Sequence, residues 1–310
     1  MTECERIIQS GIVSQSFLRP EIRNDYQITE KQKKVWLIEL DLLRKFDSLC
    51  KANGIRYFAA FGTLLGAVRH GGFIPWDDDL DVWVPREDYE RLLKVGDEQI
   101  QPPYFLQTPL NDEDYYSAFA RFRNSNTTGI MVSRHNKCNN GIYMDVFPLD
   151  GTCESSPIQY FKVEWIKFMN IVAHAYAFNI NPSRITRTIH DILHLPFISY
   201  DLRKTYRRVN ALASRKSWEA SEHVGMVVYT PKYRNNAYFK EDFSSAETLP
   251  FEFLNIPVPA GYRRILTTIY GDYMQFPPVE LRGEWHRYHF TFEPDIPYAQ
   301  YCKESRGAES

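Results

Sequence analysis

Four aspartates lie within five consecutive positions, 77 to 81, at the start of an apolar run in the stretch FIPWDDDLDVWV. The apolar and β-branched residues over 80–84 predict a buried strand, and alternate residues of a strand share a face. We therefore expect Asp79 and Asp81 to point the same way while Leu80 points into the core. Two neighbouring carboxylates at the edge of a buried strand repel each other, so this arrangement requires a cation.

Three interpretations of the acidic cluster compete. An EF-hand calcium loop needs glycine at its sixth position, where this chain has Val82, so that interpretation is rejected. A solvated turn that caps the next helix explains Asp77 and Asp78 but leaves Asp81 unexplained, because unpaired acids are rarely buried. A metal-dependent phosphoryl or nucleotidyl transfer site explains the pair of Asp79 and Asp81, since Mg²⁺ is held by carboxylates together with phosphate oxygens. We favour this third interpretation.

A third carboxylate is expected on a neighbouring strand, because sites that hold two metal ions commonly use three carboxylates. Asp145 in GIYMDVFPLD is the candidate, since it alternates with apolar residues on a second predicted strand. Alone, such an aspartate more often caps or bridges than binds metal. Together with Asp79 and Asp81 it completes a predicted set of metal ligands.

A candidate phosphate-binding turn precedes the acidic cluster. In FGTLLGAVRH, Gly62 and Thr63 follow a predicted strand over 55–61 and open a short helix over 63–70. The free N–H groups and the dipole at a helix N-terminus suit the phosphates of a nucleotide. Gly-Thr followed by Asp-x-Asp, after one helix and a loop, is the order of the nucleotidyltransferase-fold signature.

Hydrophobic spacing predicts long helices on both sides of this region. A helix over about 30–53 begins with a capping-box pattern at Thr29 and Gln32 and ends at Gly54. A further helix starts after Pro85, and short strand patterns separated by turn residues fill about 103–149. The stretch SSPIQYFKVEWIKFMNIVAHAYAFNI predicts another long helix, and a helix of about ten residues follows in the last third of the chain.

These patterns predict an α+β fold, a mixed sheet flanked by helices. The expected architecture is a nucleotidyltransferase-like core with helical additions in the C-terminal half. No Pro/Ser-rich linker divides the chain, so we expect a single catalytic domain over 29–295, with its core at 30–150 and additions at 155–295. Residues 1–28 form an N-terminal extension and residues 296–310 a C-terminal tail in this scheme.

Composition limits the partners. The 310 residues carry a net charge of -2, which argues against a nucleic-acid binder. No run of about 18 apolar residues predicts a membrane span, and the first residues do not resemble a secretory signal. We expect a cytoplasmic protein, at most bound at the inner face of the membrane. The basic segment 183–216 is either a solvated helical face or a contact for an anionic acceptor or lipid surface.

Three blocks of the chain resemble the LicD family, to which the fukutin-type transferases are similar. They read GTLLGAVRHGGFIPWDDDLDVWV, YMDVFPLD and IPVPAGYRRILTTIYGDYMQFPP, and the resemblance spans about residues 30–290. It implies a nucleotidyltransferase-fold enzyme that transfers a phosphorylated small alcohol from a CDP donor to a sugar hydroxyl and releases CMP. We expect phosphocholine from CDP-choline, with a bacterial cell-surface glycan (teichoic acid, capsule or lipopolysaccharide precursor, free or lipid-linked) as acceptor.

The resemblance also implies roles for single residues. Asp79, Asp81 and Asp145 would hold Mg²⁺ or Mn²⁺, with two ions expected, and Asp77 would support them or act as base for the acceptor hydroxyl. Substrate contacts are implied for Gly62, Thr63 and Arg69 at the donor phosphates and for Tyr270 and Asp272 in shaping the site. The ending LRGEWHRYH departs from the family pattern, so Arg282, His286 and His289 receive no role.

The identity of the donor stays open at this stage. A choline head group favours aromatic neighbours, for which Trp76, Trp83, Tyr143 and Trp285 are candidates. Glycerol phosphate or ribitol phosphate from the matching CDP donor is the first alternative and would need a polar lining. A nucleotidyltransferase that transfers the nucleotide itself, and a non-catalytic nucleotide- or glycan-binding protein on the same fold, are the others.

Overall fold

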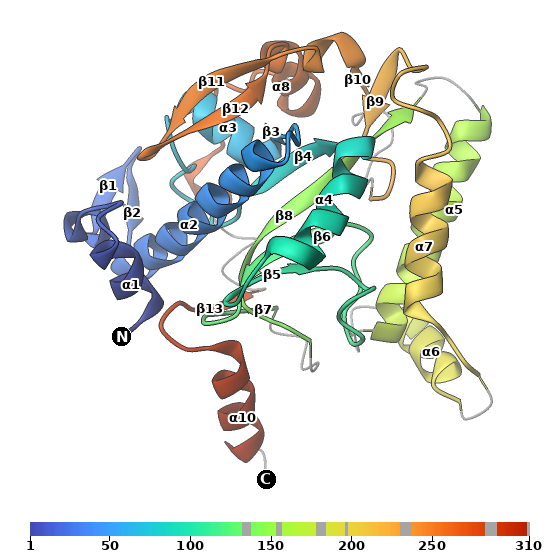
Figure 1. The fold of residues 1–310 in the computed structure, drawn as a ribbon, viewed down its shortest axis with the longest axis horizontal. Helices are drawn as coiled ribbons and strands as arrows, with labels where there is room; N and C mark the ends of the chain where they lie inside the picture. Colours follow the sequence, from blue (N-terminus) through green and yellow to red (C-terminus); the bar gives the residue numbers. More distant parts are fainter. Residues whose placement is uncertain are drawn as a thin grey trace.

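The computed structural model describes residues 1–131, 138–152, 157–177, 184–195, 198–229, 237–282 and 290–308 (Figure 1). Its helices are α1 (Glu3–Gln9), α2 (Glu30–Ala52), α3 (Phe61–Arg69), α4 (Arg86–Gln99), α5 (Pro157–Ala177), α6 (Arg184–Leu193), α7 (Leu202–Ala213), α8 (Tyr262–Tyr270) and α10 (Tyr298–Ala308), with short 3-10 turns at η1 (Gln15–Leu18), η3 (Lys240–Phe243) and η4 (Val279–Leu281).

The central sheet is mixed. Its strands are β3 (Phe58–Ala59), β4 (Asp81–Pro85), β5 (Tyr104–Gln107), β6 (Ala120–Asn124), β8 (Ile142–Thr152), β9 (His223–Gly225) and β10 (Tyr238–Phe239). The path β10-β9-β8-β4-β3 contains one parallel pair, β4 with β8, while β6 joins β8 in antiparallel fashion and carries β5. Smaller pairs are β1 (Glu21–Arg23) with β2 (Tyr26–Ile28), β11 (Ala246–Phe251) with β12 (Leu254–Pro259), and β7 (Thr128–Met131) with β13 (Phe290–Glu293). The α+β prediction is confirmed.

Helix α2 forms one side of the core and confirms the predicted helix over 30–53. Thr29 caps it by accepting a hydrogen bond from the Gln32 backbone N–H at 3.2 Å, and Gly54 adopts a left-handed φ of +59° after its end. The capping box also predicts a hydrogen bond from the Thr29 backbone N–H to the Gln32 side chain. That part of the prediction is wrong, because the Gln32 side chain donates instead to the carbonyl oxygen of Pro75 at 2.9 Å. The helix therefore contacts the loop that leads into the acidic cluster.

The strand predicted over 55–61 is shorter in the structure. Only Phe58 and Ala59 pair with β4, opposite Trp83 and Val82. The strand stops because Phe61 has a φ of +40°, outside the extended region, and starts α3. The resulting sharp turn places the first N–H groups of α3 next to the start of β4. The strand predicted at 80–84 is confirmed as β4, one residue later.

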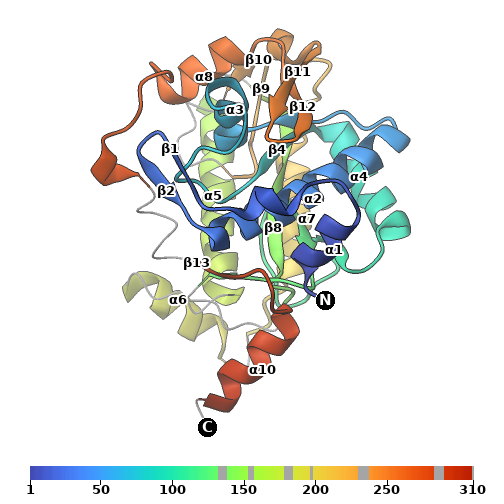
Figure 2. The same ribbon diagram turned by 90° about the vertical axis from the view of Figure 1, so that its left-hand side faces the viewer.

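Helices from the C-terminal half cover the two ends of the sheet. In Figure 1, α5, α6 and α7 form the right-hand side of the molecule, and in both views α8 lies next to α3 at the opposite end from α10 (Figures 1 and 2). The helix predicted over SSPIQYFKVEWIKFMNIVAHAYAFNI is confirmed as α5 within the described residues, and the predicted short helix of the last third is α8, which ends at Gly271. Among the described residues, no helix combines the length and apolar character needed to cross a membrane.

Candidate active site

Strands β4 and β8 bring two of the predicted carboxylates together. They run parallel, and their register pairs Asp81, the first residue of β4, with Asp145, the fourth residue of β8. The Asp145 backbone N–H donates to the Leu80 carbonyl at 2.8 Å, which fixes this register. Asp79 lies two residues before Asp81, in the loop that enters β4. The sequence prediction that Asp145 lies on a strand next to the acidic pair is therefore confirmed.

Side chains from two helices hold the acidic loop. Trp36 in α2 donates its Nε1–H to the Asp77 carbonyl at 3.0 Å. The buried hydroxyl of Thr63 in α3 accepts the backbone N–H of Asp81 at 2.8 Å. Sequence analysis assigned Thr63 to donor phosphates, whereas its oxygen in the structure positions Asp81. It missed Trp36, whose apolar spacing in α2 predicts only a core residue.

The carboxylates are crowded and poorly compensated. Burial, followed by repulsion from Asp77 and other acidic neighbours, raises the pKa of Asp79 well above its ordinary value. Burial and then repulsion from Asp145 and Asp77 raise the pKa of Asp81 in the same way. In the described part of the chain, no lysine or arginine forms an ion pair with Asp79 or Asp81. Within the described ranges, the carboxylates of Asp79 and Asp81 therefore repel their acidic neighbours without an ion pair of their own.

Two further ionisable side chains face this charge. Glu39 in α2 is 1% exposed, and burial together with Asp78, Asp77 and Asp81 raises its pKa well above the ordinary value. Tyr270 at the end of α8 also has a raised pKa, from burial of its hydroxyl and from Asp77 and its neighbours. A protonated Glu39 carries no charge, so it adds none to the cluster.

Arg121 on β6 is a site residue that sequence analysis missed. Its guanidinium pairs with Asp145 through Nε to Oδ1 at 2.6 Å and through the terminal amine to Oδ2 at 3.5 Å. It also stacks 4.0 Å from the centre of the Tyr143 ring. Arg121 and Asp145 lie opposite each other in the antiparallel register of β6 and β8. The available signal is an arginine within the short strand pattern SAFARFRN, but the sequence does not reveal which strand lies opposite.

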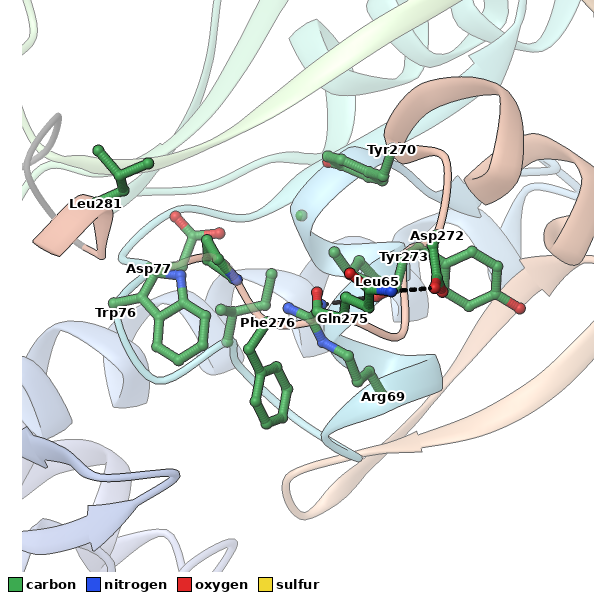
Figure 3. Close-up of a pocket in the computed structure, with 13 residues that line it drawn as sticks. Leu65, Arg69, Trp76, Asp77, Tyr270, Asp272, Tyr273, Gln275, Phe276 and Leu281 are labelled. Carbon is green, nitrogen blue, oxygen red and sulfur yellow. Dashed lines mark hydrogen bonds between the residues drawn. The ribbon is translucent and has the colours of Figure 1, made fainter. Parts of the chain in front are cut away.

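A cavity of about 440 Å³ opens beside Asp77 of the acidic loop (Figure 3). It is lined by Gly62, Leu65, Arg69, Ile74, Trp76, Asp77, Tyr270, Asp272, Tyr273, Gln275, Phe276, Pro277 and Leu281. Six predicted site residues therefore share one cavity, namely Gly62, Arg69, Trp76, Asp77, Tyr270 and Asp272. Thr63, Asp79, Asp81 and Asp145 are not part of its lining. One wall comes from α3 and the loop before β4, and the other from the segment after α8.

Gly62 allows the start of α3 and the acidic loop to approach each other closely. A Cβ atom at this position would lie 2.7 Å from Oδ2 of Asp77, closer than real contacts allow. Gly62 is the second residue of α3, and the N-cap residue Ala60 supplies no side-chain hydrogen bond. The N–H groups at this helix end therefore lie beside Asp77, where an anionic ligand can accept them.

Arg69 contributes to the wall of the cavity. One terminal amine donates to the carbonyl oxygens of Tyr273 at 2.7 Å and Gln275 at 3.1 Å, and Nε contacts the His70 ring nitrogen at 2.9 Å. The Arg69 guanidinium therefore already holds the 273–275 segment in place. To bind donor phosphates as predicted, it would have to make that contact in addition.

The aromatic residues that the sequence offers for a head-group site lie in different places in the structure. Trp76 lines the cavity and packs edge to face on Phe276. Trp83 is fully buried in the core, and Tyr143 lies under Arg121. Arg282, which received no role from the sequence, places its guanidinium 4.6 Å from the centre of the Trp76 ring. Trp285, His286 and His289 lie outside the described residues.

The acidic residues fit a hard cation in their chemistry. Carboxylate oxygens are the ligands that Mg²⁺ prefers, and the excess charge at Asp79 and Asp81 is what a bound cation would neutralise. No three histidine, cysteine or acidic side chains in the described ranges already converge as a ligand shell. Any such ion would have to draw Asp79, Asp81 and Asp145 together.

Comparison with known proteins identifies the class. Residues 54–188 match the sequence profile described as LicD/FKTN/FKRP, nucleotidyltransferase domain. This segment therefore carries a nucleotidyltransferase domain of the LicD/FKTN/FKRP type, which confirms the resemblance carried by the motifs and the expectation of a LicD-type phosphotransferase.

The relatives carry more specific names. The chain is 28% identical over 267 residues to the lipopolysaccharide cholinephosphotransferase LicD of Haemophilus influenzae, across 81% of this chain and 94% of that protein. It is 53% identical over 38 residues to the human ribitol 5-phosphate transferase FKRP, across 12% of this chain and 8% of that protein. A segment of 121 residues is 27% identical to mannosyltransferase regulator 4 of Saccharomyces cerevisiae, across 37% of this chain and 10% of that protein.

Proposed function

We propose that the protein transfers phosphocholine from CDP-choline to a hydroxyl group of a bacterial cell-surface glycan, free or lipid-linked, and releases CMP. The observation that carries this proposal is the pairing of Asp81 with Asp145 on parallel strands, beside a cavity lined by Gly62 and Asp77. The similarity to a lipopolysaccharide cholinephosphotransferase over most of both chains supports the choice of donor and acceptor.

A divalent cation, Mg²⁺ or Mn²⁺, belongs to this proposal. Asp79 and Asp81 would hold it together with Asp145, whose Oδ2 lies at the longer of its two distances from Arg121. The cation would supply neutralisation of the phosphate charge during transfer. Three carboxylates also leave room for the second ion expected from the sequence. Arg121 would orient Asp145, as hydrogen-bonding partners of metal ligands commonly do.

The chain's own groups supply binding and proton transfer. The N–H groups at the start of α3 would bind the donor diphosphate beside Gly62. Asp77, whose Oδ2 lies beside Gly62, would accept the proton of the attacking glycan hydroxyl. The hydroxyl oxygen forms the new bond to the choline-bearing phosphorus, and the bond from that phosphorus to the CMP oxygen breaks. Positioning and charge neutralisation account for the rate.

The cavity lining favours a cationic head group. Trp76, Tyr270 and Phe276 line it together with the carboxylates of Asp77 and Asp272. Arg282 already lies over the Trp76 ring, and Arg69 also lines the cavity, so a cationic head group would have to displace Arg282 from Trp76 or bind its other face. A cation–π contact of this kind contributes about 0.5 to 2 kcal/mol. Ribitol phosphate is the second candidate, because the FKRP match joins this chain to a ribitol 5-phosphate transferase.

The first experiment measures CMP release from CDP-choline, CDP-ribitol, CDP-glycerol and CDP-ethanolamine with a glycan acceptor and Mg²⁺. We expect turnover with CDP-choline and at least a hundredfold loss in Asp81→Asn, whose thermal unfolding should stay cooperative. Faster turnover with CDP-ribitol would replace the proposed donor.

The same assay separates the remaining alternatives. Nucleotide attached to the product, with no free CMP, would identify a transferase of the nucleotide itself. Binding of CDP donors without turnover of any of them, in the presence of Mg²⁺ or Mn²⁺, would identify a non-catalytic binding protein. A donor at about 100 times its Kd raises stability by about 2.7 kcal/mol, so thermal shift detects that binding.

A further inference from the structure

Helix α5 presents an apolar face to solvent. Ile158 is 82% exposed, Phe161 71%, Trp165 55%, and both Phe168 and Ile171 51%. Their spacing of three or four residues places them on one side of the helix, along about 20 Å of its length. The rings of Trp165 and Phe168 stack with their centres 5.4 Å apart. Monomeric soluble proteins rarely expose a continuous apolar surface of this kind.

The opposite side of α5 is firmly packed, so the exposed face has a fixed orientation. Val163, Ile166 and Ala173 are buried. Asn170 donates to the Val228 carbonyl at 2.7 Å and accepts from the Tyr116 hydroxyl at 2.6 Å. These contacts anchor the inner face of α5 to the rest of the fold. The helix therefore cannot rotate to bury its exposed apolar face in the same place.

Exposed basic side chains lie on the two helices that pack against α5. Helix α7, which packs against α5, exposes Arg203, Lys204, Arg207 and Arg208. Arg203 pairs with Glu113 and Lys204 with Asp201, whereas Arg207 and Arg208 form no ion pair in the described segments. Helix α6, which also packs against α5, adds exposed Arg187, exposed Asp191 and the exposed apolar residue Ile192, and exposed Leu195 follows its end. Figure 1 shows α5, α6 and α7 as neighbouring elements.

We propose that α5 lies in the headgroup region of an anionic lipid bilayer. Its aromatic and aliphatic side chains would enter the boundary of the acyl chains, and the arginines of α6 and α7 would contact lipid phosphates. An apolar face bordered by basic residues is the pattern of helices that lie in a membrane interface. A second copy of the chain is the less favourable occupant, because it would bring the same basic helices together.

The proposal is tested by co-sedimentation with lipid vesicles. Wild-type protein is mixed with vesicles of phosphatidylcholine alone or with about one third phosphatidylglycerol. We expect binding to the anionic vesicles that is weakened about tenfold or more in Trp165→Glu/Phe168→Glu. The single variant Trp165→Glu should also bind more weakly, and its matched control is Ile22→Glu, which places the same single charge at an exposed apolar residue on β1. Ile22→Glu should bind like wild type, and all variants should keep the wild-type unfolding temperature.

The basic residues are tested separately. Arg207→Gln/Arg208→Gln should weaken binding to anionic vesicles and reduce its salt dependence, with thermal unfolding unchanged. Equal binding of wild type and Trp165→Glu/Phe168→Glu would overturn the proposal. So would a dimer in sedimentation velocity that Trp165→Glu dissociates, because a second copy would then cover the face.

Discussion

Thr63 connects the start of α3 to the acidic strand through a single hydroxyl. Thr63→Val keeps the shape of the side chain but leaves the Asp81 N–H without its acceptor. We expect a loss of about 1 to 3 kcal/mol in the free energy of unfolding. Transfer should fall about tenfold or more, because displaced reacting groups lower the rate steeply. Urea unfolding and CMP release measure the two effects.

Thr63→Ser is the control, because it keeps the hydroxyl. It should retain most of the activity even if the lost methyl group lowers stability. Equal activity in the serine and valine variants would contradict a positioning role for the hydroxyl. This contact could not be predicted from the sequence, since Gly62 and Thr63 match a phosphate-binding pattern and nothing local indicates that Thr63 reaches the backbone of Asp81.

Among the secondary-structure elements, α2 holds the acidic loop in place through Trp36. Trp36 stacks on Phe73 with ring centres 4.6 Å apart and donates to the Asp77 carbonyl. Trp36→Phe keeps an aromatic ring but removes the donor. We expect about 1 kcal/mol less stability and a larger relative loss of transfer, about tenfold. A stability loss without any change in transfer would show that the loop is held by other contacts.

A buried ion pair joins three elements at the far end of β4. Arg86 at the start of α4 forms two hydrogen bonds to Asp150 on β8, at 2.6 and 2.9 Å, and a third to Asn210 on α7 at 2.9 Å. Arg86→Met leaves a buried aspartate without its partner, so we expect a loss of about 3 to 5 kcal/mol in urea unfolding.

The double variant Arg86→Met/Asp150→Leu should recover part of that stability, since it removes both charges. A double variant as unstable as the sum of both single variants would contradict strong coupling between the pair. The sequence places an acid at the end of the predicted strand, but its arginine partner lies in a different element and cannot be identified from local spacing.

For the whole molecule, the raised pKa values of Asp79, Asp81 and Glu39 give a pH dependence of stability. Each group binds its proton more tightly in the folded state than in the unfolded state. Their contribution to stability is therefore complete below the ordinary values of 3.8 for the aspartates and 4.5 for the glutamate, and it is lost as the pH rises toward the raised values.

Metal-free protein should therefore unfold at a higher temperature at about pH 5 than at about pH 8. Added Mg²⁺ should stabilise mainly at the higher pH, because it binds the ionised carboxylates. Asp79→Asn should show a flatter dependence in EDTA. Thermal unfolding in EDTA and in Mg²⁺ across this range measures all three effects. A melting temperature in EDTA that rises with pH would contradict the uncompensated cluster.

The sequence predicts the local parts of this molecule better than their partners. The spacing of α2, the strand after Leu80 and the place of Asp145 follow from apolar periodicity, and the structure confirms them. Arg121 and the contacts of Gln32 depend on which distant segments meet, and no single sequence states that. The predicted strand over 55–61 extends too far at its C-terminal end. Phe61 has a positive φ, and a phenylalanine gives no indication of this in the sequence.

The cavity has two walls of different origin. The acidic loop and α3 come from the N-terminal core, whereas the other wall comes from Tyr270 at the end of α8 and from Asp272, Tyr273 and Phe276 in the segment that follows. That segment is joined to the core through the backbone carbonyls that Arg69 binds, and backbone contacts do not depend on side-chain identity. Substitutions there can therefore alter which donor alcohol is accepted while the carboxylates stay unchanged. A single scaffold of this design can diverge in substrate choice without rebuilding its chemistry.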